Sequence, residues 1–225
     1  MEAERPKVGN LATVKRLPLY LRFLRQLKDS GREIVSSTYI GEHLKLEPIQ
    51  VRKDLAVTGI VGKPKVGYFI PSLIQAIEEF LGWDNNTDAF LVGAGNLGSA
   101  LLGYQGFARH GLNIVAAFDT DESKIGTHIH DKDVLPLDKL SDLVDRMHIT
   151  MGIIAVPAEA AQSVADLMIA AGITAIWNFA PVHIDVPNNI VVQNEDLASG
   201  LAVLSVKAAA ARNPKLTEKA PAYAE

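Results

Sequence analysis

One stretch decides the fold, and it reads Ala89-Phe90-Leu91-Val92-Gly93-Ala94-Gly95-Asn96-Leu97-Gly98. An apolar segment with the character of a β-strand precedes a G-x-G-x-x-G loop, and a helical pattern follows it. In such a loop Gly93 allows a tight turn, Gly95 lets a pyrophosphate approach the backbone, and Gly98 lets helix and strand pack closely. We therefore expect a dinucleotide cofactor to contact the whole loop, namely Gly93, Ala94, Gly95, Asn96, Leu97 and Gly98.

The next apolar strand ends at Asp119, 26 positions after Gly93. An acidic side chain at this place accepts hydrogen bonds from the adenosine ribose and repels a 2′-phosphate. The pattern predicts NADH and NAD as cofactors rather than their phosphorylated forms, although Arg109 and Lys124 could offset part of the repulsion. The alternative is that Asp119 only caps a loop with Thr120 and Asp121.

Strands and helices alternate through the rest of the chain. We expect strands at 88–93, 113–119, 148–156, 173–179 and 190–193, and helices at 97–109, 158–171 and 195–212. This alternation is typical of an α/β fold in which helices wrap a parallel sheet, here a Rossmann-like domain.

The residues before this domain follow a different pattern. An amphipathic helix at 14–27 precedes two short helices at 37–44 and 48–55, a basic hairpin at 59–70 and a helix at 71–81. Two short helices and a hairpin predict a winged-helix DNA-binding domain, with Gln50, Arg52 and Lys53 on the recognition helix and Lys63 and Lys65 at the hairpin tip. The expected domains are therefore 1–83 (winged helix), 84–194 (Rossmann) and 195–225 (C-terminal helix and tail).

The charges divide in the same way. Residues 1–70 hold 13 Lys and Arg against 7 Asp and Glu, although the whole chain has a net charge of -4. A basic head on an acidic body suits a partner such as DNA, because neutralised phosphates release counterions. On charge alone, an ordinary solvated surface explains the asymmetry equally well.

Composition bounds the function further. The chain has 225 residues and no cysteine, and charge or glycine interrupts each apolar run. The runs are too short for the roughly 20 residues that a membrane span needs, so we expect a soluble, cytoplasmic protein with no membrane partner. His128 and His130 alternate with Asp131 and Asp133 as in a solvated turn, so no metal site is expected.

No histidine stands in a catalytic constellation with a carboxylate or lysine, so we expect no catalytic residue. Without the basic head, the chain has room for about one nucleotide-binding domain and no separate catalytic domain. A head for DNA beside a body for NADH indicates a regulator and not an enzyme.

Several segments resemble the Rex family of bacterial redox-sensing repressors at matching spacing, namely 15–22, 50–55, 66–68, 93–99, 178–181 and 194–197. The resemblance implies a homodimer formed by exchange of the last helix, and a repressor that leaves its double-stranded operator DNA when NADH binds. It implies that Arg22, Tyr104 and Asp196 rearrange with cofactor state, Asp196 lying near the nicotinamide of the other subunit. By the same resemblance, Tyr104, Pro157, Asn178 and Asp196 contact the cofactor and Tyr68 contacts DNA.

The chain also departs from that family. It has Ala56-Val57-Thr58 where the family carries a serine and two aromatics, and Lys63-Pro64-Lys65 where the family carries Arg-Gly before Val-Gly-Tyr. The family's minor-groove arginine is absent here. Either Lys63 or Lys65 takes over the phosphate or minor-groove contact, or the operator preference differs or DNA binding is weaker. Leu197 stands where some members have phenylalanine. Two alternatives stay open: an NAD-dependent oxidoreductase, and a CoA- or nucleotide-binding module, each with an accessory basic domain.

Overall fold

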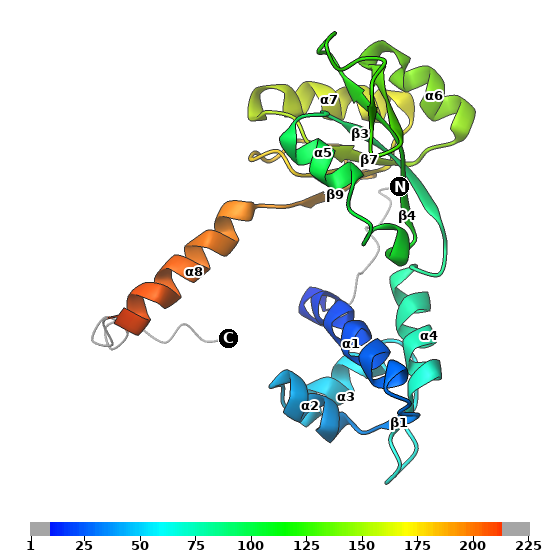
Figure 1. Cartoon of the computed structure of the whole chain (residues 1–225), viewed down its shortest axis with the longest axis vertical. Helices are drawn as coiled ribbons and strands as arrows, with labels where there is room; N and C mark the ends of the chain where they lie inside the picture. Colours follow the sequence, from blue (N-terminus) through cyan, green and yellow to red (C-terminus); the bar gives the residue numbers. More distant parts are fainter. Residues whose placement is uncertain (1–9, 213–225) are drawn as a thin grey trace. The chain divides into compact units, whose positions relative to one another are not determined.

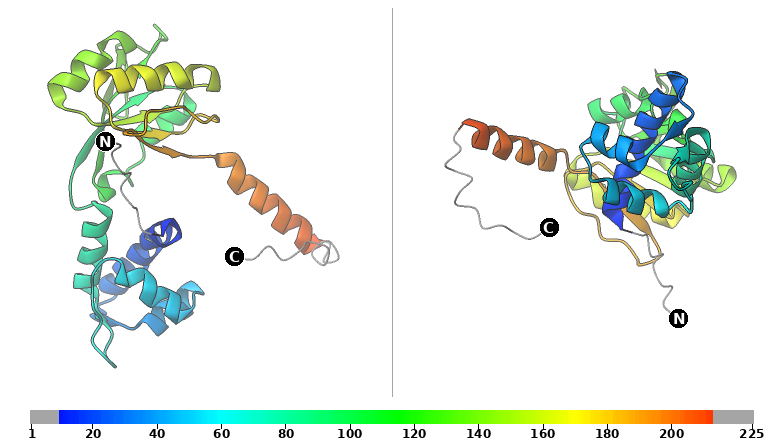
Figure 2. Two further views of the ribbon diagram at one scale, coloured as in Figure 1. Left: turned by 180° about the vertical axis from the view of Figure 1, so that it is seen from behind. Right: turned by 90° about the horizontal axis from the view of Figure 1, so that it is seen from below.

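The computed structural model describes residues 10–212 and divides them into two compact units. The first comprises the described residues up to Thr87 together with Gln105–Asn113, and the second comprises Asp88–Tyr104 and residues 114–212. Each unit has a hydrophobic core of its own. Figure 1 labels their α-helices and several of their strands, and Figure 2 shows them from two further sides. Within residues 10–212, no helix is long and apolar enough to cross a membrane.

Four helices make up most of the first unit: α1 (Leu11–Asp29), α2 (Ser37–Leu44), α3 (Pro48–Ala56) and α4 (Ile70–Leu81). The α1 helix starts three residues before the predicted position, because the Asn10 side chain accepts a hydrogen bond from the Ala12 N–H at 3.0 Å and caps it. The Ser36 side chain accepts a hydrogen bond from the Tyr39 N–H and caps α2, and Pro48 opens α3. Between α2 and α3, a Cβ atom on Gly41 would lie 2.5 Å from the Leu46 carbonyl oxygen, so the turn requires glycine.

The predicted hairpin of this unit is smaller than expected. Strand β2 (Tyr68–Phe69) pairs antiparallel with β1 (Ile34–Val35), which comes before α2, and does not pair with residues 59–62. The hairpin is reduced to one antiparallel bridge between Lys63 and Gly67. Because Gly67 has a φ of +105° and approaches the Val35 carbonyl, the hairpin is joined directly to this small sheet.

A seven-stranded sheet forms the centre of the second unit, in the order β5-β6-β4-β3-β7-β8-β9. These strands are β3 (Thr87–Val92), β4 (Leu112–Asp119), β5 (His128–Ile129), β6 (Lys132–Pro136), β7 (Met151–Ile154), β8 (Ala175–Asn178) and β9 (Val191–Asn194). The pairs β4 with β6, β3 with β7, β7 with β8 and β8 with β9 are parallel, and β5 is antiparallel to β6. The sheet agrees with the predicted α/β class.

Helices α5 (Asn96–Leu102), α6 (Leu140–Met147), α7 (Ala158–Ala171) and α8 (Leu197–Arg212) complete the second unit, and α6 packs beside α7 (Figure 1). Short 3-10 helices lie at Ala108–His110 and Leu137–Lys139. The predicted helix at 97–109 was wrong in its second half, because α5 ends at Leu102 and glycine follows it. The sequence also did not reveal β5, β6 and α6.

Candidate functional site

The glycine loop closes the carboxyl end of β3. Gly93 has a φ of +103°, and a Cβ atom there would lie 2.5 Å from the Ala155 carbonyl oxygen. A Cβ atom on Gly98 would overlap the Gly93 carbonyl oxygen. These two glycines are therefore required by the protein's own packing, as the sequence predicts.

Gly95 differs from both neighbours in this respect. Its φ is -77°, and no protein atom lies within 4 Å of the position that a Cβ atom would take. The backbone here does not need glycine, and the empty space opens on the cavity beside the loop. A bound group that approaches the Gly95 backbone would account for the missing side chain.

That cavity has a volume of about 430 Å³, a size typical of small-ligand sites. Much of its lining comes from the ends of three neighbouring strands: Val92 and Gly93 at the end of β3, Asp119 at the end of β4, and residues 155–157 after β7. The chain runs from β3 to β4 on one side and later returns to β7 on the other, so β3 lies where the strand order reverses. Ligands of α/β proteins bind at this place. Pro157 lines the cavity and precedes α7.

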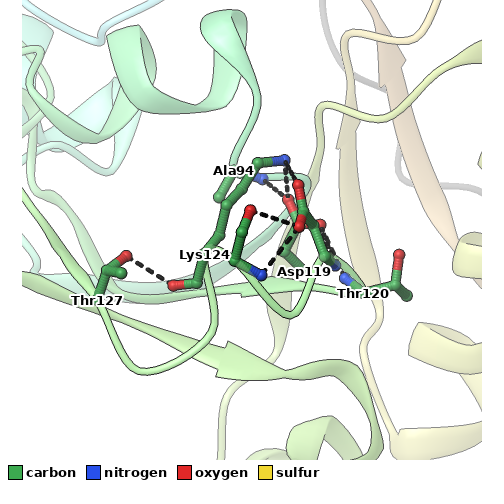
Figure 3. A network of polar contacts seen from close by, with 7 residues as sticks. Ala94, Asp119, Thr120, Lys124 and Thr127 are labelled. Carbon is green, nitrogen blue, oxygen red and sulfur yellow. Dashed lines mark hydrogen bonds and ion pairs between the residues drawn. The ribbon is translucent and has the colours of Figure 1, made fainter.

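Asp119 is the charged centre of this cavity, and Figure 3 shows its contacts. Its Oδ2 accepts hydrogen bonds from the Ala94 N–H at 2.8 Å and from Lys124 Nζ at 3.1 Å. Its Oδ1 accepts from the backbone N–H groups of Thr120 at 2.8 Å and Asp121 at 2.9 Å. Burial raises the pKa of Asp119, but the Asp121 N–H and Lys124 outweigh that effect and lower it below the usual value. The carboxylate therefore caps its own loop and also holds the glycine loop.

The other predicted cofactor residues are more dispersed. Asn178 is fully buried at the end of β8, and its amide donates to the Val182 carbonyl at 2.7 Å and to Asn194 Oδ1 at 2.9 Å. It also accepts from the Ala180 N–H, so its role in the structure is to join the loop after β8 to β9. Tyr104 is 57% exposed, and the exposed Asp196 accepts from the Ala198 N–H at 2.8 Å at the start of α8.

The predicted switch residues belong to different units. Arg22 is exposed on α1 of the first unit, whereas Tyr104 and Asp196 are in the second. The side chain of Leu197 lies outside the described set.

A second candidate site is the cationic surface of the first unit. Arg52 and Lys53 on α3 and Lys63 and Lys65 in the hairpin are all exposed, and none makes an ion pair with another described residue. A groove of about 320 Å³ connects the two elements, lined by Arg52, both lysines, Ser36, Ser37 and Tyr68 among others. Solvated cations without anionic partners favour an anionic ligand.

The hairpin tip has an unusual backbone. The Val66 N–H donates to the Lys63 carbonyl at 3.1 Å, so Pro64 and Lys65 occupy the centre of a tight turn. Lys65 has a φ of +62°, a conformation that favours glycine. Proline followed by a residue of positive φ is typical of a type II turn. The lysine is therefore held at the tip despite a conformational cost.

Among the residues predicted on α3, Gln50 is the one whose side chain forms a hydrogen bond with another side chain of the described residues. Its Nε2 donates a hydrogen bond to Asp54 Oδ1 at 2.8 Å. Asp54 is completely buried and was not identified from the sequence.

The turn with His128 and His130 forms the β5–β6 hairpin, in which His130 and Asp131 both have positive φ. His128 lies 2.7 Å from Asp133. In the described residues, no group of three or more histidine, aspartate or glutamate side chains is arranged to hold a metal ion.

Comparison with known proteins finds family matches in both units and relatives that match most of the chain. Residues 11–56 match a family described as the N-terminus of putative DNA-binding proteins, and residues 84–182 match the CoA binding domain. A redox-sensing transcriptional repressor Rex of Treponema denticola is 51% identical over 200 residues, covering 89% of this chain and 95% of the relative. A Rex repressor of Desulforamulus reducens is 45% identical over 194 residues, covering 86% and 92% respectively.

Solved structures of a protein from the same family are similar to this chain in fold. A crystal structure of RSP in complex with β-NAD⁺ and operator DNA has a TM-score of 0.86 and 31% identity, covering 96% of this chain and all of RSP. RSP in complex with β-NADH has a TM-score of 0.83 and 30% identity, covering 95% and 98%. RSP is itself described as a Rex-family repressor.

Proposed function

The chain belongs to the Rex family of redox-sensing transcriptional repressors, and we propose that it represses genes by binding operator DNA through its first unit and senses NADH through its second. Membership of a repressor family sets aside the oxidoreductase alternative. The observation that carries the proposal is the Gly95 backbone, which is open to a 430 Å³ cavity with the Asp119 carboxylate in its wall. Both features suit the pyrophosphate and the ribose of a dinucleotide.

The cavity favours NADH and NAD among dinucleotides. The loop N–H groups and the start of α5 would receive the pyrophosphate, and Asp119 would accept hydrogen bonds from the ribose. Because Lys124 is 3.1 Å from Asp119, the carboxylate charge is partly neutralised, so we expect preference for NADH over NADPH and not absolute exclusion. The adenine would lie against the apolar wall that includes Leu137, Val156 and Val164. Tyr104, Pro157, Asn178 and Asp196 are proposed to contact or support the remainder.

We propose that the first unit is a winged helix that docks α3 in the major groove of double-stranded DNA. Arg52, Lys53 and Gln50 would face bases and phosphates, while Lys63, Lys65 and Tyr68 of the hairpin side would contact the adjacent backbone or minor groove. The uncompensated cations on both elements support this arrangement. The boundaries proposed for the domains are 1–83, 84–194 and 195–225, and the site of action is the cytoplasm.

The proposed dimer depends on α8. Its apolar side chains Leu201, Val203, Leu204 and Val206 are between 55% and 70% exposed in the single chain. They lie on more than one face of the helix, as burial between two surfaces requires. We therefore propose that each subunit gives α8 to its partner, with Asp196 near the partner's cofactor and Arg22 and Tyr104 responding to the cofactor's redox state.

Two binding measurements test the proposal. In the first, the full chain selects duplexes from a fluorescein-labelled library, and the recovered sites should be palindromic. In the second, binding of NADH is measured by fluorescence energy transfer from the tryptophans to the cofactor. Failure of DNA binding at low salt contradicts the repressor function, and failure of NADH binding contradicts the sensor function.

A further inference from the structure

Asp54 is a buried carboxylate surrounded by donors from two helices. It accepts five hydrogen bonds from four side chains: Thr13 Oγ1 (2.8 Å), Arg16 Nε (2.6 Å) and Nη2 (2.8 Å), Tyr20 Oη (2.7 Å) and Gln50 Nε2 (2.8 Å). Thr13, Arg16 and Tyr20 lie on α1, whereas Gln50 and Asp54 are one turn apart on α3. The network therefore fixes the α3 helix on α1 and ends at the side chain of Gln50.

The chemistry of Asp54 determines which way the Gln50 amide points. Burial alone would raise the pKa of Asp54, but the hydrogen bonds from Arg16, Tyr20, Thr13 and Gln50 lower it to about 2. An ionised carboxylate can only accept hydrogen bonds, so the NH₂ group of Gln50 has to face it. The opposite orientation would place two oxygens 2.8 Å apart without a proton between them.

This orientation leaves the oxygen of Gln50 available. Over residues 10–212, Oε1 has no hydrogen-bond partner, and no buried side-chain oxygen or nitrogen lacks one, so Oε1 is accessible to solvent. Gln50 is the third residue of α3, in the first turn. Residues at the start of a recognition helix contact base edges in the major groove. What the helix presents there is thus a fixed acceptor.

We propose that Asp54 is a positioning residue that fixes Gln50 with Oε1 as a hydrogen-bond acceptor on the DNA-reading surface, so that the protein selects a base with an amino group. In the major groove these bases are adenine, through N6, and cytosine, through N4. Guanine and thymine present carbonyl oxygens there, which an acceptor does not bind, so the acceptor reads which strand of a base pair carries the amino group. This inference rests on the proposed DNA-binding function and assigns one element of its specificity.

The test is a base-preference matrix measured with the full chain. Starting from a selected duplex, each base pair of one half-site is replaced in turn, and the dissociation constant is measured by fluorescence anisotropy. At one position of the strand that Gln50 faces, the wild type should prefer adenine or cytosine over guanine or thymine by up to about tenfold, the value of one hydrogen bond. Gln50→Met removes the amide oxygen and leaves the other four hydrogen bonds to Asp54 in place, so it should abolish the preference at that position alone.

Two further variants separate positioning from support of the fold. Asp54→Asn can donate as well as accept, so the Gln50 amide can take either orientation and the preference at that position should fall. Tyr20→Phe removes a different hydrogen bond from Asp54 and should keep the wild-type preference, whatever it does to stability. A general loss of α3 support would weaken binding to all duplexes equally.

Each outcome decides one point. The inference is overturned by a wild-type preference for guanine or thymine at the Gln50-dependent position, or by a matrix that Gln50→Met leaves unchanged. A folded Asp54→Asn protein that keeps the full wild-type preference also overturns it. If Asp54→Asn does not fold, the direction of the wild-type preference together with its loss in Gln50→Met still shows whether Gln50 presents an acceptor. If the wild type binds no duplex, the proposed function fails instead, and the two failures are distinguishable.

Discussion

The carboxylate of Asp119 accepts a hydrogen bond from the backbone N–H of Ala94 at 2.8 Å, which joins the end of β4 to the glycine loop after β3. The same carboxylate carries three further hydrogen bonds, from Thr120, Asp121 and Lys124. The residue proposed to bind the ribose thus also sets the shape of the loop proposed to bind the pyrophosphate.

Asp119→Ala should therefore weaken NADH binding by about ten- to a hundredfold, since it removes a charged acceptor and releases the loop. Energy transfer from tryptophan to NADH measures the affinity. Asp142→Ala is the control, because Asp142 is exposed and only pairs with Arg146 at 3.3 Å. Equal NADH affinity in Asp119→Ala and the wild type would contradict the assignment.

The glycines of the loop should respond differently to an added methyl group. Gly98→Ala forces a Cβ atom into the Gly93 carbonyl and should lower the melting temperature, by several degrees if the cost is about 2 kcal/mol. Gly95→Ala meets no protein atom and should melt like the wild type while losing NADH binding. Normal NADH affinity in a folded Gly95→Ala protein would show that the cofactor does not approach this backbone.

Asp54 should make the first unit sensitive to acid. Its pKa is about 2 in the folded state and near 3.8 when unfolded, so its ionised form stabilises the fold. The contribution, about 2 kcal/mol, is complete above pH 5 and is lost as the pH falls from about 4 toward 2. Urea unfolding of Trp177→Phe, in which Trp83 of the first unit is the remaining tryptophan, measures this dependence. Adding Asp54→Asn should flatten the dependence of the free energy of unfolding on pH over that range. An unchanged slope would exclude a stabilising role of the Asp54 carboxylate.

The exposed apolar residues of α8 should control assembly. Replacing Leu201 and Leu204 by glutamate places charges where an interface would bury apolar side chains, so the double variant should be monomeric at micromolar concentration by light scattering. Lys207→Glu, an exposed position on the same helix, should remain dimeric. A wild-type monomer, or a double variant that still dimerises, would contradict the proposed exchange of α8.

Local patterns predicted the parts of the structure that depend on neighbouring residues. The strand, glycine loop and acid at 88–119 and the Pro48 start of α3 all follow from short-range rules, and the structure has them. The helix at 97–109 was extended too far because its apolar spacing continues past Leu102, where glycine ends it. The β5–β6 hairpin was missed because its turn uses His130 and Asp131 at positive φ in place of glycine.

Long-range pairing explains the remaining differences. Strand β2 pairs with β1, more than 30 positions earlier, and no local signal favours that partner over residues 59–62. The Asp54 network likewise joins residues 34 to 41 positions apart. The spacing of Thr13, Arg16 and Tyr20 puts three polar groups on one side of α1, which was a signal of a buried acceptor, but it does not identify Asp54 as that acceptor.

The central claim is that NADH binding and operator binding oppose each other. Anisotropy of a labelled operator duplex bound by the full chain, with NADH or NAD⁺ added at equal concentrations, measures this coupling directly. The account predicts that NADH releases the duplex, and that NAD⁺ leaves it bound and raises the NADH concentration needed for release. A duplex that stays bound while energy transfer shows the NADH sites to be filled would contradict the account.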